Sequence, residues 1–370
     1  MLVRPRVLDL FCGCGGLSLG FRLAGFDVAL AVDTYEEALE VYSKNFPNSE
    51  IANADLAETD ASELFARVNL EPENVDVVVG GPPCQGFSLM GNRDMDDDRN
   101  ELLLRFAEYV VDVEPDYFVM ENVKGLVTGE TTAFLASFED TVTRAGYEIV
   151  SPIRCIDATD YGIPQRRERI IVIGHDEEVP APDYPAELDE EVDVGDAIGD
   201  IPAVLTDEEI ADGVYSGPLG ERSEYVKEIN SCPSFAESVA DGLTEMEPVN
   251  HTTDVRNRFD EVQPGGVDDV SGFKRLEYDE PANTLRAGSS RDKGTHTPAR
   301  PIHPEAPRAI TVREAARLQT FPDWFQFHGT KYHGLRQIGN SVPPKVAKLI
   351  AEEMFEVITD KEAAMPIGSR

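Results

Sequence analysis

The sequence has no apolar run long enough to cross a bilayer, which excludes a membrane-spanning protein. Residues 1–6 lead almost at once into a strand pattern, so we expect no signal peptide and a cytoplasmic protein. Cysteines number only five and lack paired spacing, which argues against a disulfide framework. Cys12 and Cys14 have no second pair or nearby histidine, so we expect small turn residues and no bound metal.

Positive charge is also scarce. Lysine and arginine total 33 against 70 acidic residues, the net charge is −37, and only nine of the cations are lysine. Nucleic-acid-binding proteins are usually basic, so one interpretation is an acidic protein that avoids nucleic acid. The spread of acids through the chain instead resembles proteins of halophilic prokaryotes. At the 1 M salt of such cells the Debye length falls to ~3 Å, which damps the repulsion between the carboxylates of one chain. We therefore expect the fold to weaken in dilute buffer.

With 370 residues the chain can bury a large core in one large domain or two. Short buried-strand patterns alternate with helical patterns, which predicts an α/β fold with a mostly parallel sheet. The expected strands are 7–11, 28–32, 51–56, 75–79, 117–120, 147–155 and 170–173. The expected helices are 17–24, 35–45, 101–112, 131–145 and 345–358. Thr311 and Glu314 have the spacing of a capping box at the start of a further helix.

A glycine-rich turn, Cys12-Gly13-Cys14-Gly15-Gly16, follows the first expected strand and precedes a helix. Small residues there let backbone N–H groups approach a ligand at a helix N-terminus. Asp33 ends the second strand twenty residues after Gly13, and an acid at that spacing can accept hydrogen bonds from ribose hydroxyls. The turn lacks the third glycine of the dinucleotide fingerprint, which argues against a nicotinamide dehydrogenase.

The strand 75–79 ends in Gly80-Gly81-Pro82-Pro83, and the stiff turn presents Cys84. This is the sheet edge at which α/β proteins bind ligands, and a held thiol suits a nucleophile. Buried free thiols are common, however, so Cys84 alone fits an incidental turn cysteine as well.

Two further polar groups follow buried strands. Glu121, in Glu121-Asn122-Val123, ends an apolar strand, where desolvation favours a protonated carboxyl that could donate a proton. The run Gln165-Arg166-Arg167-Glu168-Arg169 could bind a phosphate or a base carbonyl through arginine forks. A solvated turn is the alternative interpretation of that run.

Together these stretches resemble the motifs of DNA cytosine-5 methyltransferases. Gly-Pro-Pro-Cys-Gln-Gly-Phe-Ser at 81–88, Glu-Asn-Val at 121–123 and Gln-x-Arg-x-Arg at 165–169 are followed by matching segments at 307–319 and 337–344. Only about 176–270 lies outside the resemblance. It implies a Rossmann-like, S-adenosylmethionine-dependent catalytic domain at 1–180. It further implies a smaller, loop-rich target-recognition domain at 181–325 and a returning segment at 326–370.

The resemblance also implies residue roles. Cys84 would attack carbon 6 of cytosine, Glu121 would hold ring nitrogen 3 and the amine, and Arg167 the ring carbonyl. Arg169 would support nearby backbone or phosphate. Residues expected to bind S-adenosyl-L-methionine are Phe11, Gly13, Gly15, Gly16, Asp33, Asp55, Leu56, Pro82, Leu102, Asn340, Ser341 and Val342. Residues expected to contact DNA are Gln85, Ser88, Arg99, Arg286, Arg291 and Lys293.

The implied reaction transfers a methyl group to carbon 5 of a flipped-out cytosine in a specific double-stranded DNA sequence. The enzyme would be a monomer, either solitary or paired with a cognate restriction endonuclease. One rival is a tRNA cytosine-5 methyltransferase, but that branch carries a Cys-Phe-Thr signature which is missing here. Another is a non-enzymatic binding protein, which would need no thiol at position 84.

Overall fold

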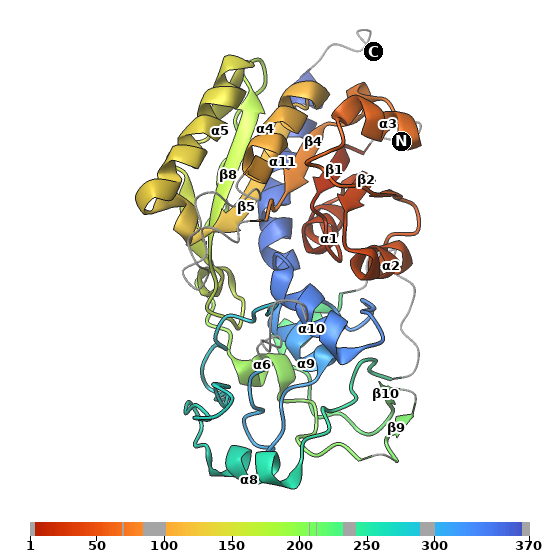
Figure 1. Cartoon of the computed structure of the whole chain (residues 1–370), viewed down its shortest axis with the longest axis vertical. Coiled ribbons are helices and arrows are strands. Elements are labelled where there is room, and N and C mark those ends of the chain that lie inside the picture. Colours follow the sequence, from red (N-terminus) through yellow and green to blue (C-terminus); the bar gives the residue numbers. More distant parts are fainter. Residues whose placement is uncertain are drawn as a thin grey trace.

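The computed structural model describes residues 4–68, 70–83, 101–206, 208–211, 213–231, 242–288 and 300–364. Figure 1 shows a sheet with helices in the upper part of the view and short helices with long loops below it. No helix within these ranges is both long and apolar enough to pass through a membrane.

A twisted sheet of eight strands, counted over the described residues, organises the upper part in the order β3-β2-β1-β4-β5-β8-β6, with β7 paired to β8. Pairing from β3 to β5 is parallel, whereas β8 runs antiparallel to β5, β6 and β7. The predicted mostly parallel sheet is therefore confirmed. The strands are β1 (Arg6–Leu10), β2 (Asp27–Asp33), β3 (Glu50–Asn53), β4 (Val77–Gly80), β5 (Tyr117–Val123), β6 (Tyr147–Ile149), β7 (Arg154–Asp157) and β8 (Glu168–Asp176).

Helices cover both faces of this sheet, which explains why its central strands are continuously apolar. One face packs against α3 (Ala61–Val68), α4 (Glu101–Val113) and α5 (Thr132–Arg144). The other face packs against α1 (Gly16–Leu23), α2 (Glu36–Asn45) and α11 (Pro344–Ala364). The carboxyl ends of β1, β2, β4 and β5 consequently meet at one edge, facing the lower part of the molecule (Figure 1).

The helix α11 returns from the lower part and packs against α1 (Figure 1). The approach is close, because a Cβ added at Gly20 would lie 2.3 Å from the Cβ of Ala347. Glycine is therefore required at this helix crossing.

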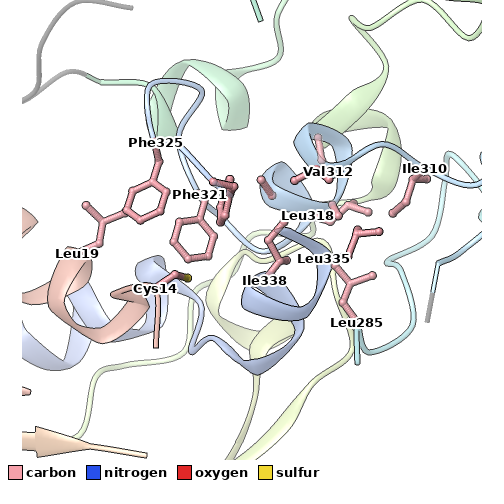
Figure 2. Packing of buried hydrophobic residues seen from close by; sticks show 14 of the residues in the cluster. Cys14, Leu19, Leu285, Ile310, Val312, Leu318, Phe321, Phe325, Leu335 and Ile338 are labelled. Carbon is pink, nitrogen blue, oxygen red and sulfur yellow. The ribbon is translucent and has the colours of Figure 1, made fainter. Parts of the chain in front are cut away.

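The lower part contains short elements joined by loops. They are α6 (Val194–Ile198), β9 (Ile210–Ala211), β10 (Val214–Tyr215), α7 (Glu224–Ile229), α8 (Thr253–Glu261), α9 (Val312–Leu318) and α10 (Lys331–Asn340). Its apolar core is continuous with the upper part: Figure 2 shows Phe321 and Phe325 beside Leu19 of α1 and Cys14 of the glycine turn. The two parts therefore share one hydrophobic core.

Helix α9 begins with the predicted capping box, which is confirmed: the Thr311 hydroxyl accepts from the Glu314 amide, and Glu314 accepts from the Thr311 amide. Glu314 also receives two hydrogen bonds from Arg308, at 2.7 and 2.8 Å. The buried side chains of Thr311 and Glu314 at the start of this helix therefore have hydrogen-bond partners.

Some predicted boundaries were wrong, and two of them have a clear consequence. The single strand expected at 147–155 is split into β6 and β7, because Pro152 has no N–H to donate to a ladder. The last helix continues to Ala364 and does not stop near Ile358.

Candidate active site

A cleft of about 700 Å³ opens at the carboxyl edge of the parallel strands. Its walls come from the segments that follow β1, β2, β3, β4 and β5, from the start of β8 and from residues 336–342. This is the edge at which α/β sheets place ligands. Eleven of the twelve predicted cofactor residues line the cleft; they are Phe11, Gly13, Gly16, Asp33, Asp55, Leu56, Pro82, Leu102, Asn340, Ser341 and Val342.

The glycine turn is shaped by the segment that covers it. A Cβ at Gly16 would lie 2.0 Å from the Ser341 hydroxyl oxygen and 2.3 Å from the Val342 carbonyl oxygen, so residues 340–342 sit directly on the turn. Gly15 does not line the cleft; its φ is +97°, and a side chain there would overlap the rings of Tyr42 and Phe46. Gly15 is thus required for packing behind the cleft.

Asp33 joins two of the cleft-forming turns. Its two carboxylate oxygens accept hydrogen bonds from the amides of Gly13 and Tyr35, each at 2.8 Å. Burial raises the pKa of Asp33, and these amides oppose the rise. Each carboxylate oxygen can accept more than one hydrogen bond, so a ribose contact by Asp33 stays a prediction compatible with these amide bonds.

Glu121 and Arg169 form an ion pair inside the cleft, with Glu121 Oε1 2.8 Å from Arg169 Nε. Arg169 lies at the start of β8, opposite Val123 of β5, which brings its side chain beside Glu121. The Glu121 carboxylate also faces Gly81, since a Cβ added there would lie 3.4 Å from Oε2. Gly81 is followed in the sequence by Pro82, Pro83 and Cys84.

Arg167 is bonded to backbone carbonyls of three distant residues, and its predicted contact with the ring carbonyl stays a prediction. Its side chain is only 2 % exposed, and its guanidinium donates to the carbonyls of Leu285, Gly339 and Ser341. Burial lowers the pKa of Arg167 to about 9. Although Arg167 borders the cleft, these donors are already used, and it is Arg169 that contacts Glu121.

Several predicted residues lie outside the described ranges. They are Cys84, Gln85, Ser88, Arg99, Arg291 and Lys293. Arg286 is described, and its backbone borders the end of α10, where a Cβ at Gly339 would lie 2.5 Å from the Arg286 carbonyl carbon.

Among the cleft residues that sequence reasoning missed, two contact each other through their side chains. Tyr35 and Arg336 form part of the wall, with the Arg336 guanidinium 4.8 Å from the centre of the Tyr35 ring. The Tyr35 hydroxyl is hydrogen-bonded to Nδ1 of His333. A signal was available for Arg336, because it precedes Asn340 by four residues and shares its helix face.

Cys12 and Cys14 are buried, and burial raises the pKa of both thiols, which keeps them neutral. Within the described part of the chain no cluster of three or more His, Cys, Asp and Glu side chains could hold a metal ion.

The cleft fits S-adenosylmethionine in its chemistry. Apolar side chains of Phe11, Leu56 and Leu102 suit an adenine ring, and the carboxylates of Asp33 and Asp55 suit hydroxyl and amine donors. The cradle between Gly16 and Ser341 leaves no room for a side chain on the turn. An α/β sheet with a cleft of this lining at its carboxyl edge fits the class of S-adenosylmethionine-dependent methyltransferases.

Comparison with known proteins identifies the family within this class. The chain belongs to the family of C-5 cytosine-specific DNA methylases, which it matches over residues 5–356. It is 40% identical to the type II methyltransferase M.XorII of Xanthomonas oryzae pv. oryzae over 97% of this chain and 87% of that protein. It is 33% identical to the type II methyltransferase M1.HphI of Haemophilus parahaemolyticus over 96% of this chain and 87% of that protein.

Solved structures agree with this assignment. A DNA modification methyltransferase encoded within an E. coli prophage superposes with a TM-score of 0.79 at 31% identity, covering 96% of this chain and 99% of that one. DNMT2 of Spodoptera frugiperda has a TM-score of 0.59 at 19% identity over 95% of this chain and 99% of its own, which shows the shared fold. The protein is accordingly an S-adenosylmethionine-dependent DNA (cytosine-5) methyltransferase.

Proposed function

We propose that this enzyme methylates carbon 5 of a flipped-out cytosine in double-stranded DNA through a transient covalent bond to Cys84. The observation that carries the proposal is the Glu121–Arg169 pair. It borders the cofactor cleft and faces Gly81, three residues before Cys84 in the chain. A base entering there would meet a carboxyl group and a guanidinium close to the segment that leads along the chain to Cys84.

The cofactor supplies an electrophilic methyl group on a sulfonium. The Cys84 thiolate adds to carbon 6 of the ring, which makes carbon 5 nucleophilic. Carbon 5 takes the methyl group as the bond between methyl and sulfur breaks. A base removes the proton from carbon 5, and the bond between Cys84 sulfur and carbon 6 breaks to restore the thiolate. The ring faces are unreachable in a duplex, so the cytosine must be flipped out at a cost of a few kcal/mol.

Glu121 would hold ring nitrogen 3 and the exocyclic amine, which requires a proton on its carboxyl group. For the ring carbonyl we now propose Arg169 in place of Arg167. The contact between Arg169 and Glu121 supports this choice, because neighbouring edges of one base need neighbouring side chains. The carbonyl bonds of Arg167 support a structural role.

The type II relatives support a place in a restriction–modification system, with a cognate endonuclease cutting the same unmethylated sequence. We propose that the enzyme acts as a monomer on DNA. Residues 1–180 would form the catalytic domain, 181–325 the target-recognition domain and 326–370 the returning segment. Arg286, Arg291 and Lys293 would lie in the DNA-reading region. The net charge of −37 further supports a halophilic source.

A tritium-transfer assay tests the proposal. It measures the label that passes from S-adenosylmethionine to unmethylated plasmid DNA and to bulk tRNA. We expect label in DNA and none in tRNA, and we expect Cys84→Ser to abolish transfer while S-adenosylhomocysteine still binds. Turnover by Cys84→Ser at the wild-type rate would refute the covalent route, and label in tRNA alone would favour the rival substrate. Bisulfite sequencing of the host genome with and without the gene would reveal the recognised sequence.

A further inference from the structure

Arg167 connects two segments that are far from it in the sequence. Its Nη1 donates to the carbonyls of Leu285 and Gly339, at 3.2 and 3.3 Å. Its Nη2 donates to the carbonyls of Gly339 and Ser341, at 3.3 and 3.0 Å. One side chain therefore holds the segment around Leu285 and the segment around Gly339 together.

The first of these segments, residues 282–287, is fastened to the chain that carries Arg167. Two backbone hydrogen bonds join Ala282 to residues just before Arg167. The Arg166 amide donates to the Ala282 carbonyl at 2.8 Å, and the Ala282 amide donates to the Pro164 carbonyl at 2.9 Å. The Leu285 amide donates to the Gln165 side chain at 3.0 Å. Under the proposed function this segment leads directly into the DNA-reading region.

The second segment, residues 339–342, is the cap over the glycine turn of the cofactor cleft. It is held from a second side by Gln319, whose amide donates to the Ser341 carbonyl at 2.6 Å. Gln319 in turn accepts from Gln165 at 2.5 Å. Gln165, Arg167 and Gln319 thus form one buried hydrogen-bond network between the two segments.

We infer that Arg167 is a positioning residue that couples DNA binding at residues 282–287 to cofactor binding beneath residues 339–342. The inference rests on the proposed function for the identity of the two ligands. A movement of either segment changes hydrogen bonds that the other shares, so each ligand alters the affinity for the other. Thermodynamic linkage requires this effect to be equal in both directions.

Arginine is the residue suited to this task. Its planar fork offers five donors in fixed directions, and no described carboxylate lies within ion-pair distance of the Arg167 side chain. Lysine would present one ammonium and could not span the same carbonyls. Three buried arginines of the lower part, Arg308, Arg313 and Arg317, pair with carboxylates instead.

Arg275 provides a matched control. It is 6 % exposed, and its guanidinium donates to the carbonyls of Pro304 and Phe259 in the lower part. Like that of Arg167, its Nε is buried without a hydrogen-bond partner among the described residues. It does not border the cleft. A change at Arg275 therefore matches the chemistry of the Arg167 change without touching either segment.

The experiment measures the dissociation constant of S-adenosylhomocysteine by calorimetry, with and without saturating unmethylated plasmid fragments, on the full chain. The coupling factor is the ratio of the two constants. We expect the wild type to show a factor in the range of about 5 to 150. Arg167→Lys should bring the factor to within about twofold of one, while Arg275→Lys retains the wild-type value. A wild-type factor of one, an unchanged factor in Arg167→Lys, or an equal loss in both variants would overturn the inference.

Hydrogen exchange on the wild-type enzyme gives a test that needs no variant. Saturating S-adenosylhomocysteine should slow exchange of amides in 282–287 as well as in 339–342, and leave the remote helix α8 unchanged. Protection confined to 339–342 would overturn the inference. If the wild-type enzyme shows protection in both segments but transfers no methyl group to DNA, the result would instead count against the proposed function.

Discussion

The carboxylate of Glu121 and the guanidinium of Arg169 meet across β5 and β8, 2.8 Å apart, with 12 % and 19 % of their side chains exposed. The antiparallel register sets this contact, because Arg169 is opposite Val123, two residues beyond Glu121 on the same face of β5. Parallel strands alone would bring only carboxyl ends together. The reversed strand β8 contributes its amino end, and with it a cation, to the same edge.

Glu121→Gln should therefore lower kcat by on the order of 100-fold, because the amide cannot supply a proton to ring nitrogen 3. Affinity for S-adenosylhomocysteine should stay within about twofold of wild type. Initial methylation rates and calorimetry check both values. The control is Glu168→Gln, whose exposed pair with Lys124 contributes little. Wild-type kcat in Glu121→Gln would exclude the proton-donor role.

Gly16→Ala should weaken cofactor binding at least tenfold. The added methyl group would lie 2.0 Å from the Ser341 hydroxyl oxygen and 2.3 Å from the Val342 carbonyl, so the cap must move away from the turn. Gly329→Ala is the control, since a Cβ added there would have nothing within 4 Å and the φ of Gly329 is not positive. Calorimetry with S-adenosylhomocysteine measures the change. Equal affinities in the two variants would show that the cap does not hold the cofactor.

Asp9 should make stability depend on pH. Its carboxylate is fully buried and accepts from Ser18 at 2.5 Å, and burial raises the pKa of Asp9 to about 7. In the unfolded chain this carboxyl titrates near ~3.9, so between about pH 4 and 7 the folded protein binds the extra proton. The free energy of unfolding must then fall as pH rises through that window.

Asp9→Asn has no proton to lose, so its urea-unfolding free energy should fall less than that of the wild type between pH 5 and pH 8. Asp27→Asn, at a largely exposed position, controls for the change of residue type. Parallel pH profiles for Asp9→Asn and the wild type would contradict the expectation.

Salt should stabilise the fold. Because the net charge is −37, screening of repulsion between carboxylates should raise the unfolding temperature as potassium chloride increases from 0.1 to 2 M. A combined change of the exposed acids Glu187→Gln, Asp189→Asn and Glu191→Gln should raise the unfolding temperature at 0.1 M and have little effect at 2 M. Potassium glutamate distinguishes screening from a chloride effect. An unfolding temperature independent of salt would argue against a halophilic source.

Local chemistry made much of the fold predictable. The capping box of Thr311 and Glu314, the alternation of strands and helices, and the glycine turn all depend on neighbours within a few residues. The division of the 147–155 strand could also have been anticipated from Pro152.

The roles of the two arginines could not be separated in this way. Arg167 and Arg169 are two residues apart and point to the same side of an extended chain, so spacing gives them equal claims to the base. Carbonyls of Leu285, Gly339 and Ser341 bind one and leave the other to Glu121. These carbonyls come from segments more than a hundred residues away, and no local pattern identifies them.

The cap over the glycine turn has a consequence for biosynthesis. Cys14 and its hydrogen-bond acceptor in α10, the Gln337 carbonyl, are separated by 323 residues. A ribosome must therefore make nearly all of this fold before the cleft has its second wall, and contacts of such long range form slowly. A growing chain therefore lacks a complete cofactor cleft until its last hundred residues are made, and a product that ends before α11 leaves the apolar side of α1 uncovered.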